Sequence, residues 1–349
     1  MIERLRGRAS GGRLRTRDAA PGAGGGPASE IDPDGLEARL VWIWGSPRSG
    51  GTWLLRLLGH PLDPDPDSAL GYTPPAEQPR SALDTLPVDE TFISNHLAPA
   101  LADPRIVDGR WTPGSLNNLL SSRPAYVFSD EYAEIWEPAA KTLALTRLRG
   151  VLARGREARI PFTDDPLVVI KETNGSHAAD IVMRIMSQSR MLLLIRDARD
   201  VVDSLLHAYQ PGGFFAAKQG REFKDADERT EGLEWAARLW ACNTDMTLKA
   251  IEAHDPRLTR TVRYEDLLAD TAGELGGLLE WLELPRAPGH ADELAERYSF
   301  SSVPDELKGP LTRNRAARPG LWRENLSEAE QDRVNEICGP LLERFGYEL

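Results

Sequence analysis

The sequence predicts an α/β fold in which a parallel β-sheet is flanked by helices. Short runs of consecutive apolar residues recur along the chain, which is typical of strands covered on both faces. A helical pattern separates two of these runs, as in a βαβ unit. The first run also leads directly into a glycine-rich turn and a helical pattern, an arrangement found where open parallel sheets bind ligands.

Each element follows from its own pattern. Apolar runs predict strands at 40–44, 167–170, 191–195 and, more weakly, 258–262. Apolar residues at helical spacing predict helices at 178–188, 231–253 and 327–344. The first of these helices is the expected crossover between the second and third strands.

The amino-acid composition argues against several classes of binding partner and of metal or disulfide site. The 349 residues carry 42 Lys and Arg against 54 Asp and Glu, a formal net charge of −12 that would repel nucleic acid. No stretch has the roughly 18 consecutive apolar residues of a membrane span, and the first 30 residues contain no signal-peptide core. The two cysteines are far apart, which favours neither disulfides nor a zinc site. We therefore expect a cytoplasmic protein with no metal site.

Two segments differ in composition from the remainder. Residues 1–36 are rich in Gly, Pro, Ala and Arg and should form a disordered tail, so the folded domain is expected to cover 37–349. Residues 61–88 contain too many Pro and Asp residues for regular structure and are predicted to be a surface insertion. We expect an insertion over 61–165 to shape the mouth of a substrate site.

The first strand is followed by Gly45-Ser46-Pro47-Arg48-Ser49-Gly50-Gly51-Thr52. Glycines let backbone N–H groups approach a phosphate closely, and Arg48 adds a permanent cation that can bind oxyanions with two hydrogen bonds. Gly51 stands where a nucleotide-triphosphatase loop would have its phosphate-binding Lys, which argues against ATP hydrolysis. This segment alone fits either a phosphate site or a tight structural turn.

Charged residues also begin where the third strand ends. Arg196 would lie at the strand tip and Ser204 eight residues later in the next helix, so both could face one phosphate. Asp197 fits either an N-cap, with Asp200 in the first turn, or a magnesium ligand. A later segment, 308–323, carries five cations and no acid, and we interpret it as part of a phosphate clamp.

Together these segments resemble the cytosolic-type sulfotransferases that use 3′-phosphoadenosine 5′-phosphosulfate (PAPS). Residues 47–53 (PRSGGTW) are similar to that family's 5′-phosphosulfate loop, and Arg196 with Ser204 matches its 3′-phosphate motif. Residues 262–267 (VRYEDL) resemble the segment whose Tyr lies near the adenine. Residues 315–322 (RAARPGLW) resemble the segment that closes over the 3′-phosphate. The resemblance extends from about residue 38 onward.

The resemblance implies a single sulfotransferase domain with a P-loop-like phosphosulfate-binding loop, and PAPS as the donor. It implies cofactor-binding roles for Pro47, Arg48, Ser49, Gly50, Gly51, Thr52, Trp53, Arg196, Ser204, Tyr264, Arg315 and Arg318. It also implies a small-molecule, glycan or lipid acceptor with a free hydroxyl, or an amine. Arg48 would neutralise charge on the bridging oxygen as adenosine 3′,5′-bisphosphate leaves. The sequence leaves open whether the protein forms a homodimer.

Three differences from the family pattern concern the loop and the catalytic base. The family's first loop Thr is Gly51 here, and Arg48 stands where many members have Lys. The small-molecule enzymes carry K-x-H after the second strand, whereas this chain reads Lys171-Glu172-Thr173, with His177 further on. We predict that Glu172 is the catalytic base, and His177 is the alternative. His60 and His96 are two further candidates that rank behind these. Glu172 could instead form a salt bridge with a loop arginine.

Other interpretations stay open at the sequence level. Five aromatic residues could line an acceptor pocket or belong to the core, namely Trp111, Tyr126, Phe128, Tyr132 and Trp136. A phosphotransferase of the nucleoside-monophosphate-kinase kind, with Asp197 on magnesium, is the second functional hypothesis. A non-catalytic nucleotide-binding module is the third. The missing loop Lys argues against the second, and the retained Arg48, Arg196 and Ser204 argue against the third.

Overall fold

The computed structural model describes residues 31–59, 84–88, 132–157, 162–219, 222–285, 287–305, 308–309 and 316–349. Residues 1–30 of the predicted tail lie outside this set, as does most of the predicted insertion. Residues 31–36 pack against the domain, since Leu36 is fully buried and Asp32 accepts hydrogen bonds from the backbone N–H groups of Leu36 and Glu37. The folded part therefore begins earlier than the predicted boundary at residue 37.

A parallel sheet forms the centre of the protein and confirms the predicted fold class. Its strands are β1 (Leu40–Trp44), β2 (Thr85–Val88), β3 (Leu167–Lys171), β4 (Arg190–Ile195) and β5 (Thr259–Arg263). They are arranged in the order β2-β3-β1-β4-β5, and each neighbouring pair is parallel. Each of the predicted strands matches a strand of the structure to within one residue. Strand β1 lies between β3 and β4, so the crossover from β3 to β4 passes β1.

Strand β2 is a correction to the prediction that 61–88 lacks regular structure. Thr85–Val88 pairs with β3 from Thr85↔Leu167 to Val88↔Ile170. Pro87 has no N–H to donate, but β2 lies at the edge of the sheet, where one side of the strand needs no partner. The Pro-rich composition therefore did not prevent a short edge strand.

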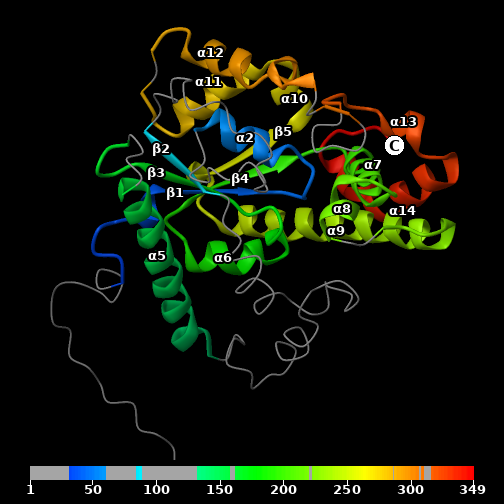
Figure 1. The fold of residues 1–349 in the computed structure, drawn as a ribbon. Helices are drawn as coiled ribbons and strands as arrows, with labels where there is room; N and C mark the ends of the chain where they lie inside the picture. Colours follow the sequence, from blue (N-terminus) through cyan, green and yellow to red (C-terminus); the bar gives the residue numbers. More distant parts are fainter. Residues whose placement is uncertain are drawn as a thin grey trace, which may run out of the picture.

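Helices cover both faces of the sheet (Figure 1). They are α2 (Gly51–Leu57), α5 (Ala133–Glu157), α6 (Ala179–Ile185), α7 (Ala198–Tyr209), α8 (Phe214–Gln219), α9 (Ala226–Ala253), α10 (Tyr264–Ala269), α11 (Thr271–Trp281), α12 (His290–Arg297), α13 (Trp322–Asn325) and α14 (Glu328–Arg344). The predicted helices at 178–188, 231–253 and 327–344 correspond to α6, α9 and α14. Helix α5 lies inside the predicted insertion and was not predicted.

The core divides according to the alternation of side chains along β1. Trp42 and Trp44 face one side of the sheet and pack with α5 and α6, whereas Val41 and Ile43 face the other side and pack with α2 and α11. A third apolar cluster joins β4 to α7, α9 and α14. Among the five aromatic residues considered for the acceptor pocket, Trp136 is buried in the first cluster and Tyr132 packs against it, so these two belong to the core. The other three lie outside the described residues.

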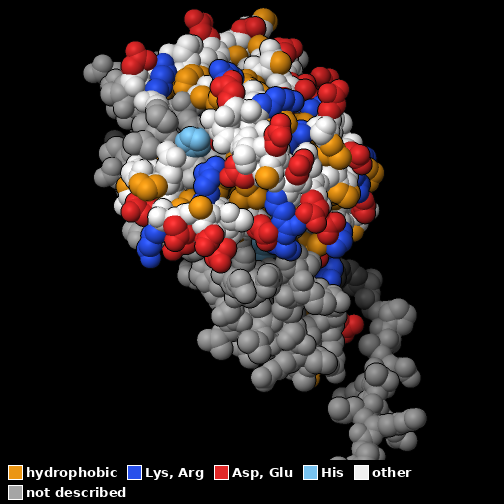
Figure 2. Space-filling model, turned by 90° about the vertical axis from the view of Figure 1, so that its right-hand side faces the viewer, with side chains coloured by type: hydrophobic (Ala, Val, Ile, Leu, Met, Phe, Trp, Pro, Cys, Tyr) orange, Lys and Arg blue, Asp and Glu red, His pale blue; other side chains and the backbone are white. Residues whose placement is uncertain are grey.

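This architecture brings the carboxyl ends of β1, β3 and β4 to one edge of the sheet, where Arg48, Lys171 and Arg196 line one cavity. On the face shown in Figure 2, acidic and basic side chains are interspersed over the described surface.

Within the described part of the chain, no helix is both long and apolar enough to cross a bilayer.

Candidate functional site

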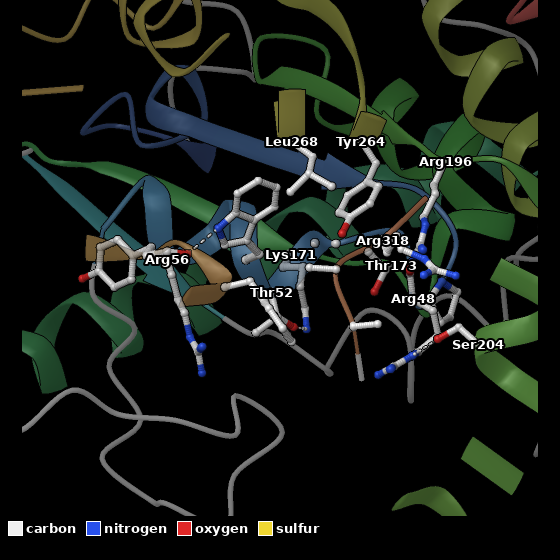
Figure 3. Close-up of a pocket in the computed structure, with 18 of the residues that line it drawn as sticks. Arg48, Thr52, Arg56, Lys171, Thr173, Arg196, Ser204, Tyr264, Leu268 and Arg318 are labelled. Atoms are coloured by element: carbon white, nitrogen blue, oxygen red, sulfur yellow. Dashed lines mark hydrogen bonds between the residues drawn. The ribbon is translucent and has the colours of Figure 1, made fainter. Parts of the chain in front are cut away.

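A cavity of about 310 Å³ opens at the carboxyl ends of β1, β3 and β4 (Figure 3). Its polar wall comes from the loop after β1, the start of α2, the end of β3 and the tip of β4. Its described lining is Pro47, Arg48, Gly50, Gly51, Thr52, Trp53, Arg56, Lys171, Thr173, Asn174, Arg196, Ser204, Phe215, Tyr264, Leu268, Tyr298, Phe300, Val303, Ala316, Ala317, Arg318 and Leu321. The cavity therefore joins segments that the sequence had singled out separately.

The loop after β1 requires glycine at two positions. A Cβ at Gly45 would lie 2.3 Å from the backbone oxygen of Leu194, and one at Gly50 would lie 2.6 Å from Cδ2 of Tyr264. Both glycines also have positive φ values, of 144° and 92°. Arg48 has a φ of 72°, which is uncommon for a residue with a side chain. The loop is thus wrapped closely against β4 and Tyr264.

Arg48, Arg196 and Ser204 meet at one end of the cavity. Nε of Arg48 donates a hydrogen bond of 3.0 Å to Oγ of Ser204, and Nη1 of Arg196 donates one of 3.0 Å to the backbone oxygen of Arg48. Figure 3 shows these side chains together at one side of Thr52 and Lys171. The ends of two neighbouring strands therefore combine into one cationic site.

Tyr264, the first residue of α10, supports this cationic site. The guanidinium carbon of Arg196 lies 4.5 Å from the centroid of the Tyr264 ring, and the ring of Trp53 meets Tyr264 edge-on at 6.0 Å. Nε1 of Trp53 donates to the backbone oxygen of Tyr298 at 2.8 Å. Burial raises the pKa of Tyr264, so its hydroxyl remains protonated at neutral pH.

Asp197 is confirmed as the N-cap of α7. Its carboxylate accepts a hydrogen bond from the backbone N–H of Arg199 and holds the Arg199 guanidinium with two further bonds of 2.9 and 2.8 Å. These bonds give Asp197 the structural role that the sequence allowed.

The late basic segment reaches the cavity through Ala316, Ala317, Arg318 and Leu321. Its backbone is held by Asp200, which accepts from the N–H groups of Gly320 and Trp322 at 2.8 and 3.4 Å. Arg318 is more than half exposed and pairs with Glu324 at the surface. Arg315 lies outside the described residues.

Some residues predicted for the site lie elsewhere. Ser49 is buried and does not line the cavity. Glu172 is only 1% exposed and is also absent from the wall. Side chains alternate along a strand, so Glu172 faces away from the side on which Lys171 reaches α2.

His177 occupies a short 3-10 helix, Ser176–Ala178, and does not line the cavity either. Burial lowers the pKa of His177 to about 4, which keeps its imidazole neutral at pH 7. His60 and His96, the two further candidates, lie outside the described residues. The structure therefore brings neither Glu172 nor His177 to the cavity wall, and the identity of the base stays a prediction.

Lys171 lines the cavity, although the sequence analysis did not assign it to the site. Its Nζ lies 3.4 Å from Oγ1 of Thr52 and donates to it. The described wall carries the cations Arg48, Arg56, Lys171, Arg196 and Arg318 and includes no carboxylate or histidine. The sequence did carry a signal for Lys171, because it is the last residue of an apolar strand. Such a position lies at the edge of a parallel sheet where ligands bind. Such a wall fits a ligand with more than one anionic group.

Comparison with known proteins identifies the family of this chain. A family model described as the sulfotransferase family matches residues 41–288. No curated protein sequence matches the chain. Similar solved structures include mouse sulfotransferase SULT7A1 complexed with PAP, at 14% identity, 91% coverage of this chain, 93% of that chain and a TM-score of 0.47.

Two further solved structures are similar at the same level. Sulfotransferase STF9 from Mycobacterium avium is 16% identical, with 92% of this chain and 82% of that chain covered and a TM-score of 0.45. A sulfotransferase domain from the curacin biosynthetic pathway is 19% identical, with 88% and 98% covered and a TM-score of 0.42. The family model covers well over half of the chain, and this protein belongs to the sulfotransferase family.

Proposed function

We propose that this protein is a PAPS-dependent sulfotransferase that transfers a sulfuryl group to a hydroxyl or amine of an acceptor molecule. The observation that carries the proposal is the contact between Arg48, on the loop after β1, and Ser204, which follows β4. Two anion-binding segments from neighbouring strands converge on one cavity, as a donor with phosphate groups at two separate positions requires.

The described residues fit such a donor. Arg196, Ser204 and Arg318 would hold the 3′-phosphate, with Arg315 joining them. The loop residues Pro47 to Trp53 would hold the 5′-phosphosulfate, and Tyr264 and Trp53 would lie near the adenine. Gly45 and Gly50 keep the loop backbone in a conformation and position that a Cβ would not allow, which supports a cradle built from backbone N–H groups.

PAPS supplies an activated sulfuryl group, whose bond to the 5′-phosphate oxygen breaks as the acceptor oxygen bonds to sulfur. Positioning and charge stabilisation would dominate the protein's contribution, as in phosphoryl transfer. Arg48 would neutralise the charge that develops on the bridging oxygen. Lys171, beside Thr52, would add a second cation to the proposed 5′-phosphosulfate site.

The proton of the acceptor also needs a destination. We retain Glu172 as the proposed base ahead of His177, because Glu172 directly follows the last residue of β3, whereas His177 lies further on in a short 3-10 helix. Neither group lines the cavity. A water molecule or a side-chain rotation would have to connect the base to the acceptor.

Calorimetry with adenosine 3′,5′-bisphosphate, AMP and ADP, without added magnesium, tests the proposed donor. Adenosine 3′,5′-bisphosphate should bind far more tightly than AMP, because only the former presents a phosphate to Arg196 and Ser204. Equal affinities would contradict the 3′-phosphate assignment. Phosphoryl transfer from ATP in the presence of magnesium would instead support the phosphotransferase alternative.

A second assay tests catalysis. Purified protein is incubated with radiolabelled PAPS and a panel of phenols, sugars, lipids and amines, and labelled acceptor is separated by chromatography. Labelled product that disappears in an Arg48→Ala variant would support the proposed activity. Tight binding of adenosine 3′,5′-bisphosphate without transfer to any member of the panel would favour the non-catalytic module.

A further inference from the structure

Gly51, the first residue of α2, is packed directly against the end of β3. A Cβ built on Gly51 would lie 3.1 Å from Cγ2 of Thr173, which is closer than ordinary van der Waals contact. The same Cβ would lie 3.3 Å from Cδ and 3.4 Å from Cγ of Lys171. The absence of a side chain at position 51 therefore makes room for Thr173 and for the aliphatic part of Lys171.

The backbone that carries Lys171, one of the two neighbours of Gly51, is held from the other side by β1. Lys171 is the last residue of β3 and pairs with Ile43 of β1, and the N–H of Glu172 donates to the backbone oxygen of Ile43 at 3.0 Å. Lys171 and Thr173 are both less than a tenth exposed. A group added at position 51 would consequently move side chains whose backbone cannot retreat.

The stem that packs beside Gly51 also carries the Lys171 ammonium. The stem of Lys171 passes beside Gly51, and its Nζ reaches Oγ1 of Thr52, the next residue of α2, at 3.4 Å. Figure 3 shows Lys171 and Thr52 side by side in the cavity. A shift of the stem would carry the ammonium away from Thr52 and from the anion that this end of the cavity receives.

We propose that Gly51 and Thr173 form a size-matched pair, and that Thr173 is a positioning residue that places the Lys171 ammonium at the phosphosulfate end of the cavity. The inference rests on the proposed function. It links two differences from the family pattern, the missing first Thr of the loop and the Thr at the position of the K-x-H histidine. A threonine at position 51 would need the space that the Thr173 methyl group occupies.

A double-mutant cycle tests the pair. Gly51→Ala adds only the Cβ, and Thr173→Ser removes only the methyl group that this Cβ would meet while keeping the hydroxyl. Gly150→Ala is the matched control, because a Cβ at this helical glycine has no neighbour within 4 Å. The probes are adenosine 3′,5′-bisphosphate and adenosine 3′-monophosphate, which lacks the 5′-phosphate, and both affinities are measured by calorimetry.

We expect Gly51→Ala to weaken binding of adenosine 3′,5′-bisphosphate by about tenfold or more, since overpacking displaces the Lys171 stem. Binding of adenosine 3′-monophosphate and the Gly150→Ala control should stay within about twofold of wild type. The double variant should recover most of the lost affinity. Losses that simply add in the double variant, or an equal loss for both nucleotides, would overturn the inference.

Thermal unfolding of the same proteins separates a failure of the proposed function from a failure of the proposed role of Thr173. If wild type fails to bind adenosine 3′,5′-bisphosphate, the proposed function fails, whereas coupling between positions 51 and 173 in the melting temperature would still report their packing. If wild type binds it and the cycle shows no coupling in affinity, the proposed function stands and the positioning role of Thr173 is wrong.

Discussion

The carboxylate of Asp200 accepts a hydrogen bond of 2.8 Å from the backbone N–H of Gly320, which lies 120 residues further along the chain. Asp200 is almost fully buried, and its other oxygen accepts from the N–H of Trp322. Its Oδ2 also lies 3.9 Å from Nη2 of Arg196. One carboxylate thus joins the cation at the tip of β4 to the segment that forms the far wall of the cavity.

Asp200→Asn tests this connection. An amide offers only one acceptor atom, so one of the two backbone N–H groups loses its partner in a buried position, at a cost of about 1–3 kcal/mol. We expect the affinity for adenosine 3′,5′-bisphosphate to fall by about tenfold, measured by calorimetry. Asp227→Asn on the exposed first turn of α9 is the control. Unchanged affinity in Asp200→Asn would separate Asp200 from nucleotide binding.

Arg48→Ala removes the cation that we place against the leaving oxygen. Turnover should fall by a factor on the order of 10² to 10³, the scale observed when one preorganised charge-stabilising donor is lost. Part of the loss should appear in KM, because Arg48 also contacts the donor before the reaction. Arg48→Lys keeps the charge and should retain more activity than Ala. Wild-type turnover in Arg48→Ala, with any true acceptor, would remove Arg48 from the mechanism.

The base is tested by comparing two variants under saturating acceptor. If Glu172 takes the proton, Glu172→Gln should lower turnover by roughly 10² to 10⁴ while affinity for adenosine 3′,5′-bisphosphate changes only a few-fold. If His177 is the base, His177→Ala should produce that loss instead. Near-normal turnover in Glu172→Gln beside an inactive but folded and nucleotide-binding His177→Ala would show that the assignment to Glu172 is wrong.

His177 also predicts a pH dependence of stability. Its pKa is about 4 in the folded protein, against an ordinary value of 6.5, so the unfolded chain binds the proton more readily. Stability from the neutral imidazole is therefore complete above pH 6.5 and is lost as the pH falls through 4. Urea unfolding should show a loss on the order of 3 kcal/mol between pH 7 and pH 4 that His177→Gln does not share. Parallel pH profiles for the two proteins would contradict the burial of a neutral imidazole.

Several features of the fold and the site could be predicted because they depend on short stretches of sequence. The run at 40–44 followed by the glycine-rich turn predicts a strand, an anion-binding loop and a helix from neighbouring residues alone. The convergence of Arg48 with Arg196 and Ser204 could also be expected, because parallel strands bring their carboxyl ends to one edge of a sheet.

Strand β2 and helix α5 were not predicted, because their local composition does not reveal the partners that they pair or pack with elsewhere in the chain. Thr85–Val88 contains a proline and follows a segment rich in Pro and Asp, yet the edge position beside β3 makes it a strand. Helix α5 was assigned to the insertion, although Trp136, Ala140 and Ala144 recur at helical spacing and pack into the core.

By itself, the sequence determined the fold class, the glycine-rich loop after the first strand and the positions of the strand ends, because each depends on local apolar pattern and turn chemistry. Only the tertiary structure decided which side chains share the cavity. Lys171 and Glu172 are adjacent in the sequence, but β3 pairs with β1 in a register that turns Lys171 toward α2 and Glu172 away from it. The contact of Gly51 with Thr173 likewise depends on how closely α2 packs onto β3, and no local pattern encodes that distance.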